Sequence, residues 1–200
     1  MVADLNPVSA GSGSASLDRI FGGLYPAEIG AVFHPRLNAV SVEFRHEMVS
    51  YRLFMDEVAR RQFASALELY NADFDGRSLI NRHRQTGAAY GRVSGRLEWQ
   101  TARFTATSVS HPTIEFGYRF RDNSPFFTVL ARSAKTDGDS GQSESRQIRI
   151  YFTRAQAAEL AAIFDQGFLM GILGPVGDVD ATPGAGYDEY GGGPEVPSDG

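Results

Sequence analysis

Arginines recur at alternate positions in strand-like segments of the second half of the chain, and this pattern is the strongest chemical signal in the sequence. In residues 113–121 the apolar positions are Ile114, Phe116, Tyr118 and Phe120, and the positions between them are Glu115, Gly117, Arg119 and Arg121. This period of two is typical of a strand with one buried and one solvated face. Because arginine neutralises phosphates and aromatic side chains stack on bases, the pattern predicts a surface for single-stranded nucleic acid.

The candidate nucleic-acid-binding residues are arginines on inferred strands, together with two aromatic residues. They are Arg92, Arg96, Trp99, Arg103, Arg119, Arg121, Arg149 and Tyr151. We expect the arginines at the solvent-facing positions to bind phosphates, and Trp99 and Tyr151 to stack on bases with little sequence preference. A solvated sheet face explains such charges equally well, and the alternation can also place Trp99 in the core.

The sequence gives little support for a thiol-based, metal-binding or enzymatic function. The absence of cysteine excludes disulfides, thiol catalysis and zinc fingers. Residues 71–76 resemble the opening of a calcium loop, but Arg82 stands where a bidentate glutamate is needed, which favours a helix-ending turn. There is no phosphate-binding glycine loop with lysine and no Gly-x-Ser-x-Gly motif. We therefore expect a non-enzymatic protein with no cofactor and no metal.

Two strand-to-helix corners organise the predicted fold. Inferred strands at 38–45 and 48–55 lead into a helix at 56–71 with Asp56 as its N-cap. Inferred strands at 113–121, 125–132 and 146–152 lead into a helix at 153–170, where Thr153 and Gln156 form a capping box. The corners overlay with a shift of 97 residues, as in a duplication, although two unrelated corners fit as well. We predict an α+β fold with two strand-rich halves of antiparallel sheet, each followed by a helix.

Composition divides the chain into three parts. Residues 1–16 are predicted to be a flexible arm, residues 17–174 a folded domain with halves at about 29–71 and 87–174, and residues 175–200 a disordered, acidic, Gly/Pro-rich tail. The formal charge of −5 is segregated, because six acidic residues and no lysine or arginine lie beyond residue 170. With no apolar run long enough to cross a bilayer and no signal-peptide pattern, we expect a cytoplasmic protein of a prokaryote or virus that makes no membrane contact.

The second corner also resembles a known family. The segment Ile148-Arg-Ile-Tyr-Phe-Thr-Arg-Ala-Gln156 looks like the last strand and helix start of a Whirly domain, and residues 162–174 resemble the apolar end that follows it. The arrangement is similar to the Whirly and PUR-type single-stranded nucleic-acid-binding families. The resemblance implies a Whirly-like fold, single-stranded DNA or RNA as partner, and a homo-oligomer, a tetramer, formed by helix packing.

Two other observations concern partners. Acidic tails are common in single-stranded-DNA-binding proteins, where they compete with nucleic acid and recruit proteins, so protein partners of the tail are expected here too. The alternative function is a protein-interaction or virion-structural module in which the arginines are only a solvated surface.

Overall fold

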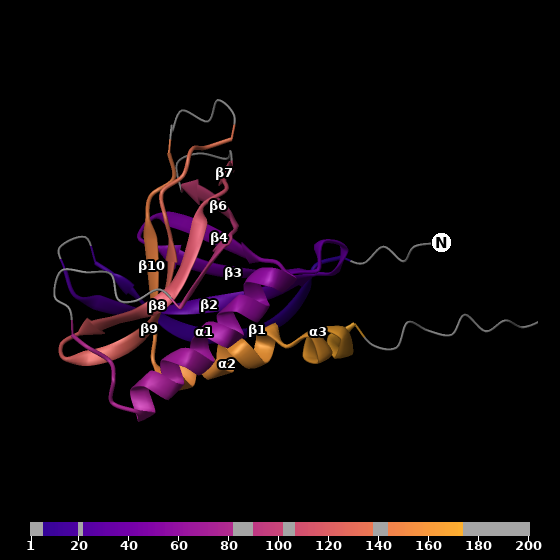
Figure 1. Ribbon diagram of the computed structural model, residues 1–200. Coiled ribbons are helices and arrows are strands. Elements are labelled where there is room, and N and C mark those ends of the chain that lie inside the picture. The colour runs from indigo at the N-terminus through magenta and orange to yellow at the C-terminus, as the bar shows by residue number, and fades with distance from the viewer. Residues whose placement is uncertain (1–5, 20–21, 82–89, 102–106, 138–143, 174–200) are drawn as a thin grey trace, which may run out of the picture.

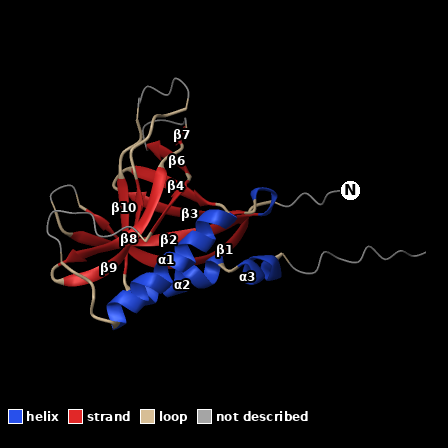
Figure 2. Ribbon diagram, in the orientation of Figure 1, coloured by secondary structure: helices blue, strands red, loops and turns tan. Residues whose placement is uncertain are grey.

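One curled antiparallel sheet makes up most of the molecule, and helices pack against its inner face (Figures 1 and 2). The computed structural model describes residues 6–19, 22–81, 90–101, 107–137 and 144–173. The strands are β1 Val8–Asp18, β2 Leu24–His34, β3 Ala39–His46, β4 Val49–Met55, β5 Gly91–Ser94, β6 Arg96–Thr101, β7 Ser108–Ser110, β8 Thr113–Arg121, β9 Ser124–Ala131 and β10 Ile148–Phe152. The helices are the 3₁₀ turn η1 Pro35–Leu37, α1 Glu57–Asp75, α2 Arg154–Phe164 and α3 Gln166–Ile172.

A single glycine joins strands from opposite sides of this sheet. The strand order is β5-β8-β9-β10-β1-β2-β3-β4-β6-β7, so β5 is at one end and β6 is next to last at the other, although only Gly95 separates them in the chain. Gly95 donates its backbone N–H to the carbonyl of Pro112 at 2.9 Å. A Cβ at this position would lie 2.2 Å from Cδ1 of Ile114, so the close approach requires glycine. The segment 91–101 therefore curls the sheet by pairing with β8 in its first part and with β4 in its second.

Strand β1 corrects the prediction of a flexible arm over residues 1–16. Residues from Val8 onward pair with β2 along their whole length, and Ser16 and Leu17 also pair with β10. The first part of β1 lies beside α2, where Gln156 donates from Nε2 to Oγ of Ser14 at 2.9 Å. Gly11, at a bulge with φ of +145°, lies against Ile163. Tertiary pairing thus orders a Gly/Ser-rich segment whose composition alone indicates flexibility.

Both predicted strand-to-helix corners are present. The Asp56 carboxylate accepts from the N–H of Ala59 at 2.8 Å and starts α1 directly after β4. Thr153 and Gln156 form the predicted capping box and start α2 directly after β10. Because each cap satisfies backbone donors that a helix start leaves unpaired, the chain can turn from strand to helix without a linker.

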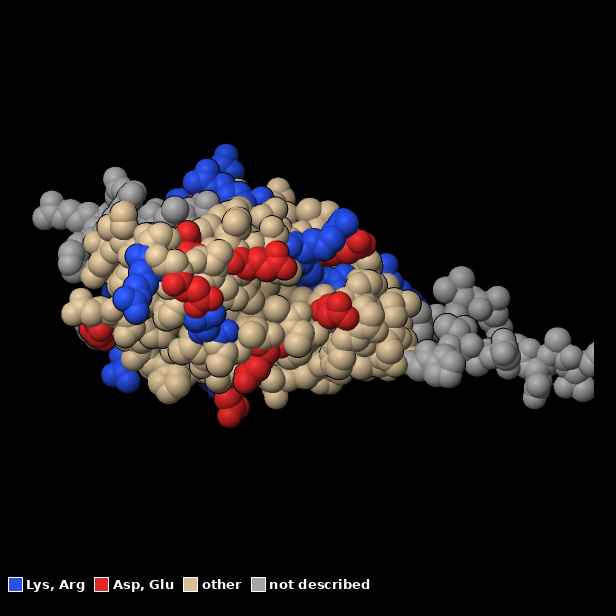
Figure 3. Space-filling view, turned by 60° about the horizontal axis from the view of Figure 1, so that its bottom comes forward, with Lys and Arg blue, Asp and Glu red and all other residues tan. Residues whose placement is uncertain are grey.

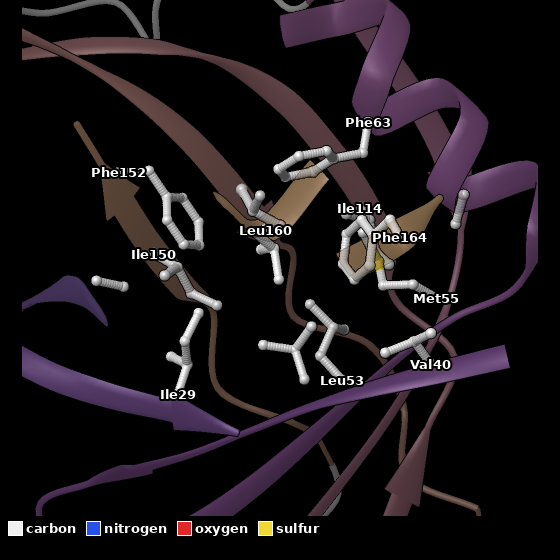
Figure 4. Packing of buried hydrophobic residues seen from close by; sticks show 14 of the residues in the cluster. Ile29, Val40, Leu53, Met55, Phe63, Ile114, Ile150, Phe152, Leu160 and Phe164 are labelled. Carbon is white, nitrogen blue, oxygen red and sulfur yellow. The ribbon is translucent and has the colours of Figure 1, made fainter. Parts of the chain in front are cut away.

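The core lies between the inner face of the sheet and helices α1 and α2 (Figure 4). Phe63 of α1 is fully buried, and its ring meets Phe116, Phe127, Phe152 and Phe164 edge-on, with centroids 5.1 to 6.5 Å apart. Burial of one such side chain contributes roughly 1.5–3 kcal/mol, and edge-to-face pairing adds to it. This phenylalanine cluster joins α1, α2 and strands from β8 to β10 into one core.

The architecture differs from the predicted one in several respects. The strands form one continuous sheet in place of two separate halves, because β1 bridges β10 and β2. The expected helix at 153–170 is divided at Asp165, which ends α2 and caps α3. Residues 91–101 form two strands, β5 and β6, divided at Gly95. Residues 102–106, and the predicted tail beyond residue 173, lie outside the described part of the chain.

Candidate functional site

Five arginines lie on the outer face of β5, β8 and β10 and directly after the end of β9, and we call this surface the arginine face. Its members are Arg92, Arg119, Arg121, Arg132 and Arg149. The strand register places Arg92, Glu115, Leu130 and Arg149 in one row across the four strands. Two carboxylates, Glu115 and Asp18, lie among the arginines, so these strands carry an excess of positive charge on this face.

Glu115 is the centre of an arginine cluster. It is 7% exposed, and it accepts two hydrogen bonds from Arg132, from Nε and Nη2, each of 2.8 Å. Nε of Arg92 lies 2.8 Å from the same carboxylate. The hydrogen bonds from Arg132 hold the pKa of Glu115 below its usual range, and the charges of Arg132, Arg92 and Arg149 act in the same direction against burial. One carboxylate thus orders two guanidinium groups, each of which has more N–H donors than this carboxylate accepts from it.

A second cluster joins β8, β10 and β1. Tyr151 is fully buried, and its hydroxyl donates to the carboxylate of Asp18, 3.0 Å away at Oδ2. Arg121 donates from Nη2 to the same hydroxyl at 2.9 Å and forms an ion pair with Asp18. Burial raises the pKa of Tyr151. Burial acts to lower the pKa of Arg121, but the Tyr151 hydroxyl and the Asp18 carboxylate outweigh it and raise that pKa.

Arg119 and Phe126 form the open part of the arginine face. They are opposite each other in the β8–β9 register, and both are partly exposed. Among the residues that the structure describes, Arg119 has no ion pair or hydrogen-bonded side-chain partner. The Phe126 ring packs edge-on against Tyr151, with centroids 6.2 Å apart. A partly exposed aromatic ring beside an arginine is the combination that a stacking platform needs.

The predicted site residues do not all gather here. Arg92, Arg119 and Arg121 belong to the arginine face. Arg149 and Tyr151 point to the same face, as the alternation predicts, but Arg149 is 9% exposed and Tyr151 is fully buried. The expectation that both face solvent is therefore wrong, because neighbouring side chains cover this part of the sheet.

The remaining predicted residues lie elsewhere. Trp99 is 5% exposed and belongs to the inner core, which was the alternative location. Arg96 lies on β6, far along the strand order from β10, where it pairs with Glu98 and sits over the Phe54 ring at 5.3 Å. Arg103 lies outside the described residues.

Two residues of the arginine face were missed by the sequence reasoning. Arg132 ends the inferred strand at 125–132, and Phe126 alternates with the inward-facing Pro125 and Phe127. Strict alternation across both strands would have found them. The apolar character of residues 125–130 concealed this signal, since Phe126 and Leu130 extend an apolar run to the outer face.

The described residues offer no sign of a metal site or a membrane span. They contain no group of three or more His, Asp or Glu side chains placed to hold a metal ion. None of the helices in the described ranges is long and apolar enough to cross a membrane. On the face seen in Figure 3, acidic and basic side chains are interspersed among uncharged ones.

Fold and surface together define a sheet-dominated α+β protein with an arginine-bearing outer face. The chain belongs to the family described as "Uncharacterised Treponema protein", which matches residues 7–171. It is 23% identical over 159 residues to an uncharacterised protein of Treponema pallidum (strain Nichols), in an alignment that covers 79% of this chain and 56% of that protein. The chain therefore spans little more than half the length of this relative. No solved structure matches.

Proposed function

We propose that this protein binds single-stranded nucleic acid, DNA or RNA, through the arginine face. The observation that supports this most is the pair of arginines, Arg92 and Arg132, ordered around the buried carboxylate of Glu115 on the arginine face. Ordered guanidinium groups lose little side-chain entropy when they bind a phosphate, which favours binding. The partly exposed ring of Phe126 adds a surface for one base.

Binding by this surface would depend on charge more than on sequence. Each phosphate that an arginine neutralises releases counterions, so affinity falls with salt by roughly 0.7 log unit per log unit of salt for each contact to a single strand. A base on Phe126 contributes about 1–3 kcal/mol with little dependence on its identity. Specificity for one sequence is not expected, because the face presents few groups placed to read base edges.

The test is fluorescence anisotropy with a labelled single strand of about 30 to 40 nucleotides, measured from about 50 mM salt upward. Arg92→Gln together with Arg119→Gln should weaken binding and lower the salt slope by about 1.4. The matched control is Arg61→Gln with Arg77→Gln, which removes two exposed arginines from α1 and its end. Phe126→Ala should weaken binding and leave the slope nearly unchanged.

Two results would refute the proposal. One is undetectable binding by the wild-type protein at about 50 mM salt. The other is equal weakening by the face variant and the control, since this would assign binding to overall charge. A protein-interaction module, in which the arginines serve solubility, would give the first result.

A further inference from the structure

An open groove of about 780 Å³ lies on the outer surface of the sheet, away from the arginine face. Residues of β1, β2, β3, β4 and β6 line it, and Glu159 of α2 and Thr107 contribute from outside these strands. Because neighbouring strands lie about 4.8 Å apart, a path across five strands is roughly 19 Å long. The volume of the groove is in the range of sites that bind small ligands or short peptides.

The middle of the groove holds a ladder of ion pairs. Arg52 on β4 bonds from Nε to Glu43 on β3 at 3.1 Å and from Nη1 to Glu98 on β6 at 3.0 Å. These three residues are directly opposite one another in the register, so the ladder runs across the strands. Arg96 also pairs with Glu98, so two arginines balance the two carboxylates in this part of the groove.

One end of the groove carries two further carboxylates. Glu28 on β2 is opposite Ser14 of β1, and Glu159 is one helical turn beyond Gln156, which bonds to Ser14. Both side chains are exposed, and neither forms an ion pair with another described residue. Arg45 also lines the groove. Four glutamates, Glu28, Glu43, Glu98 and Glu159, face three arginines, Arg45, Arg52 and Arg96, so the negative charge of the groove lies at the Glu28 and Glu159 end.

The floor of the groove is bare at Gly30, which lies in the same row as Glu43 and Arg52. A Cβ there would meet nothing closer than Cβ of Glu43 at 3.9 Å, an ordinary contact. Packing therefore does not require glycine at this position. The missing side chain instead leaves the groove open to a ligand.

We propose that the groove binds an extended peptide segment that carries lysine or arginine, with one basic side chain held between Glu28 and Glu159. The negative charge of Glu28 and Glu159 at one end of the groove selects a cation. The length of the groove suits an extended chain of about six residues at about 3.3 Å per residue. Ser12, Ser14 and Ser50 line the groove, and their hydroxyls can bind the polar groups of such a segment. A lone metal ion would not need a path of this length.

The test uses the full chain and a labelled peptide of about eight residues with alternating Lys and Ser, and a Glu/Ser peptide as comparison. We expect the Lys/Ser peptide alone to bind. Glu28→Gln with Glu159→Gln should weaken binding about tenfold through the loss of two partly screened charge pairs. Glu68→Gln with Glu144→Gln makes the same change of charge outside the groove and should leave affinity within about twofold.

Gly30→Val is a second, steric variant. It should fold like the wild type, because a Cβ at this position meets only an ordinary contact and the side chain points to the open groove, and it should weaken peptide binding by filling the floor. Failure of the Lys/Ser peptide to bind, or equal loss in the two Glu→Gln variants, would overturn the proposal. Displacement of the peptide by spermidine at far lower concentration would also overturn it, in favour of a small polyamine. Single-strand binding should be the same in Gly30→Val as in wild type, so the two proposals fail independently.

Discussion

Arg60 is the residue whose replacement should reveal most about what holds the helices in place. It is 3% exposed, and it has no carboxylate partner among the described residues. Its guanidinium donates to the carbonyl of Phe164 at 3.2 Å, to the carbonyl of Asn38 at 3.1 Å and to Oε1 of Gln166 at 2.8 Å. One side chain of α1 thus joins the end of α2, the start of α3 and the turn before β3.

We expect Arg60→Ala to lower the free energy of unfolding by about 2–4 kcal/mol. The Phe164 carbonyl is buried and would lose its side-chain donor, at a cost of roughly 1–3 kcal/mol. Asn38 is partly exposed and Gln166 is exposed, so both can bind water and each contributes less. The buried charge offsets part of the loss, since desolvation lowers the pKa of Arg60 and its Nε has no partner in the structure.

The assay is urea unfolding followed by the fluorescence of Trp99, the single tryptophan, which is 5% exposed in the core. Arg61→Ala is the matched control, because Arg61 is exposed and has only an i,i+4 pair with Glu57, so it should cost less than about 0.5 kcal/mol. Arg60→Met, which keeps the volume and removes the charge, should cost less than Arg60→Ala. Equal stability of the Arg60→Ala and Arg61→Ala proteins would refute this reasoning.

Three further predictions concern the carboxylate of Glu115, the acidic tail and Gly95. Because the pKa of Glu115 is lowered in the folded protein, its stabilising effect is present above its unfolded pKa of about 4.3 and is lost as pH falls through the lower folded value. The difference in Tm between wild type and Glu115→Gln should therefore shrink on acidification below about pH 4, and a constant difference would contradict this. Removal of residues 176–200, which carry six acids and no base, should tighten binding of a single strand most at low salt, and unchanged anisotropy titrations at all salt concentrations would exclude competition by the tail. Gly95→Ala should cost about 1–3 kcal/mol in urea unfolding by overpacking against Ile114, and the cost should be smaller in an Ile114→Ala background; additive costs would show that the contact is not the cause.

Local patterns predicted the parts of the fold that local physics determines. The strand expected at 113–121 has the bounds of β8, and both helix starts fall at the predicted caps. Alternation is visible in these strands because one face is buried and the other carries charge. A capping residue acts within its own turn of helix, so it can be recognised without knowledge of the tertiary structure.

Features that depend on distant contacts could not be predicted in this way. The segment from Val8 to Asp18 is rich in glycine and serine, and its strand conformation depends on β2, β10 and α2. Alternation gives the face of Tyr151 and Arg149 but not what covers that face, so their burial was missed. The groove requires residues of five strands that only the sheet order brings together.

The sheet order also determines when the chain can fold during synthesis. Strand β1 leaves the ribosome first, yet one of its neighbours, β10, ends only at Phe152, and the two ends of the sheet cannot meet at Gly95 until β8 has been made. Pairings that span so much sequence form slowly, because the entropy of closing the loop is lost before the contacts form. Strands β1 to β4 can pair with one another as they emerge, but the outer edges of β1 and β4 have no partner until β10 and β6 are made. Such exposed edges are prone to association between nascent chains. The yield of folded protein should therefore depend on the rate of translation and on chaperones that hold the first half of the sheet until the second half arrives.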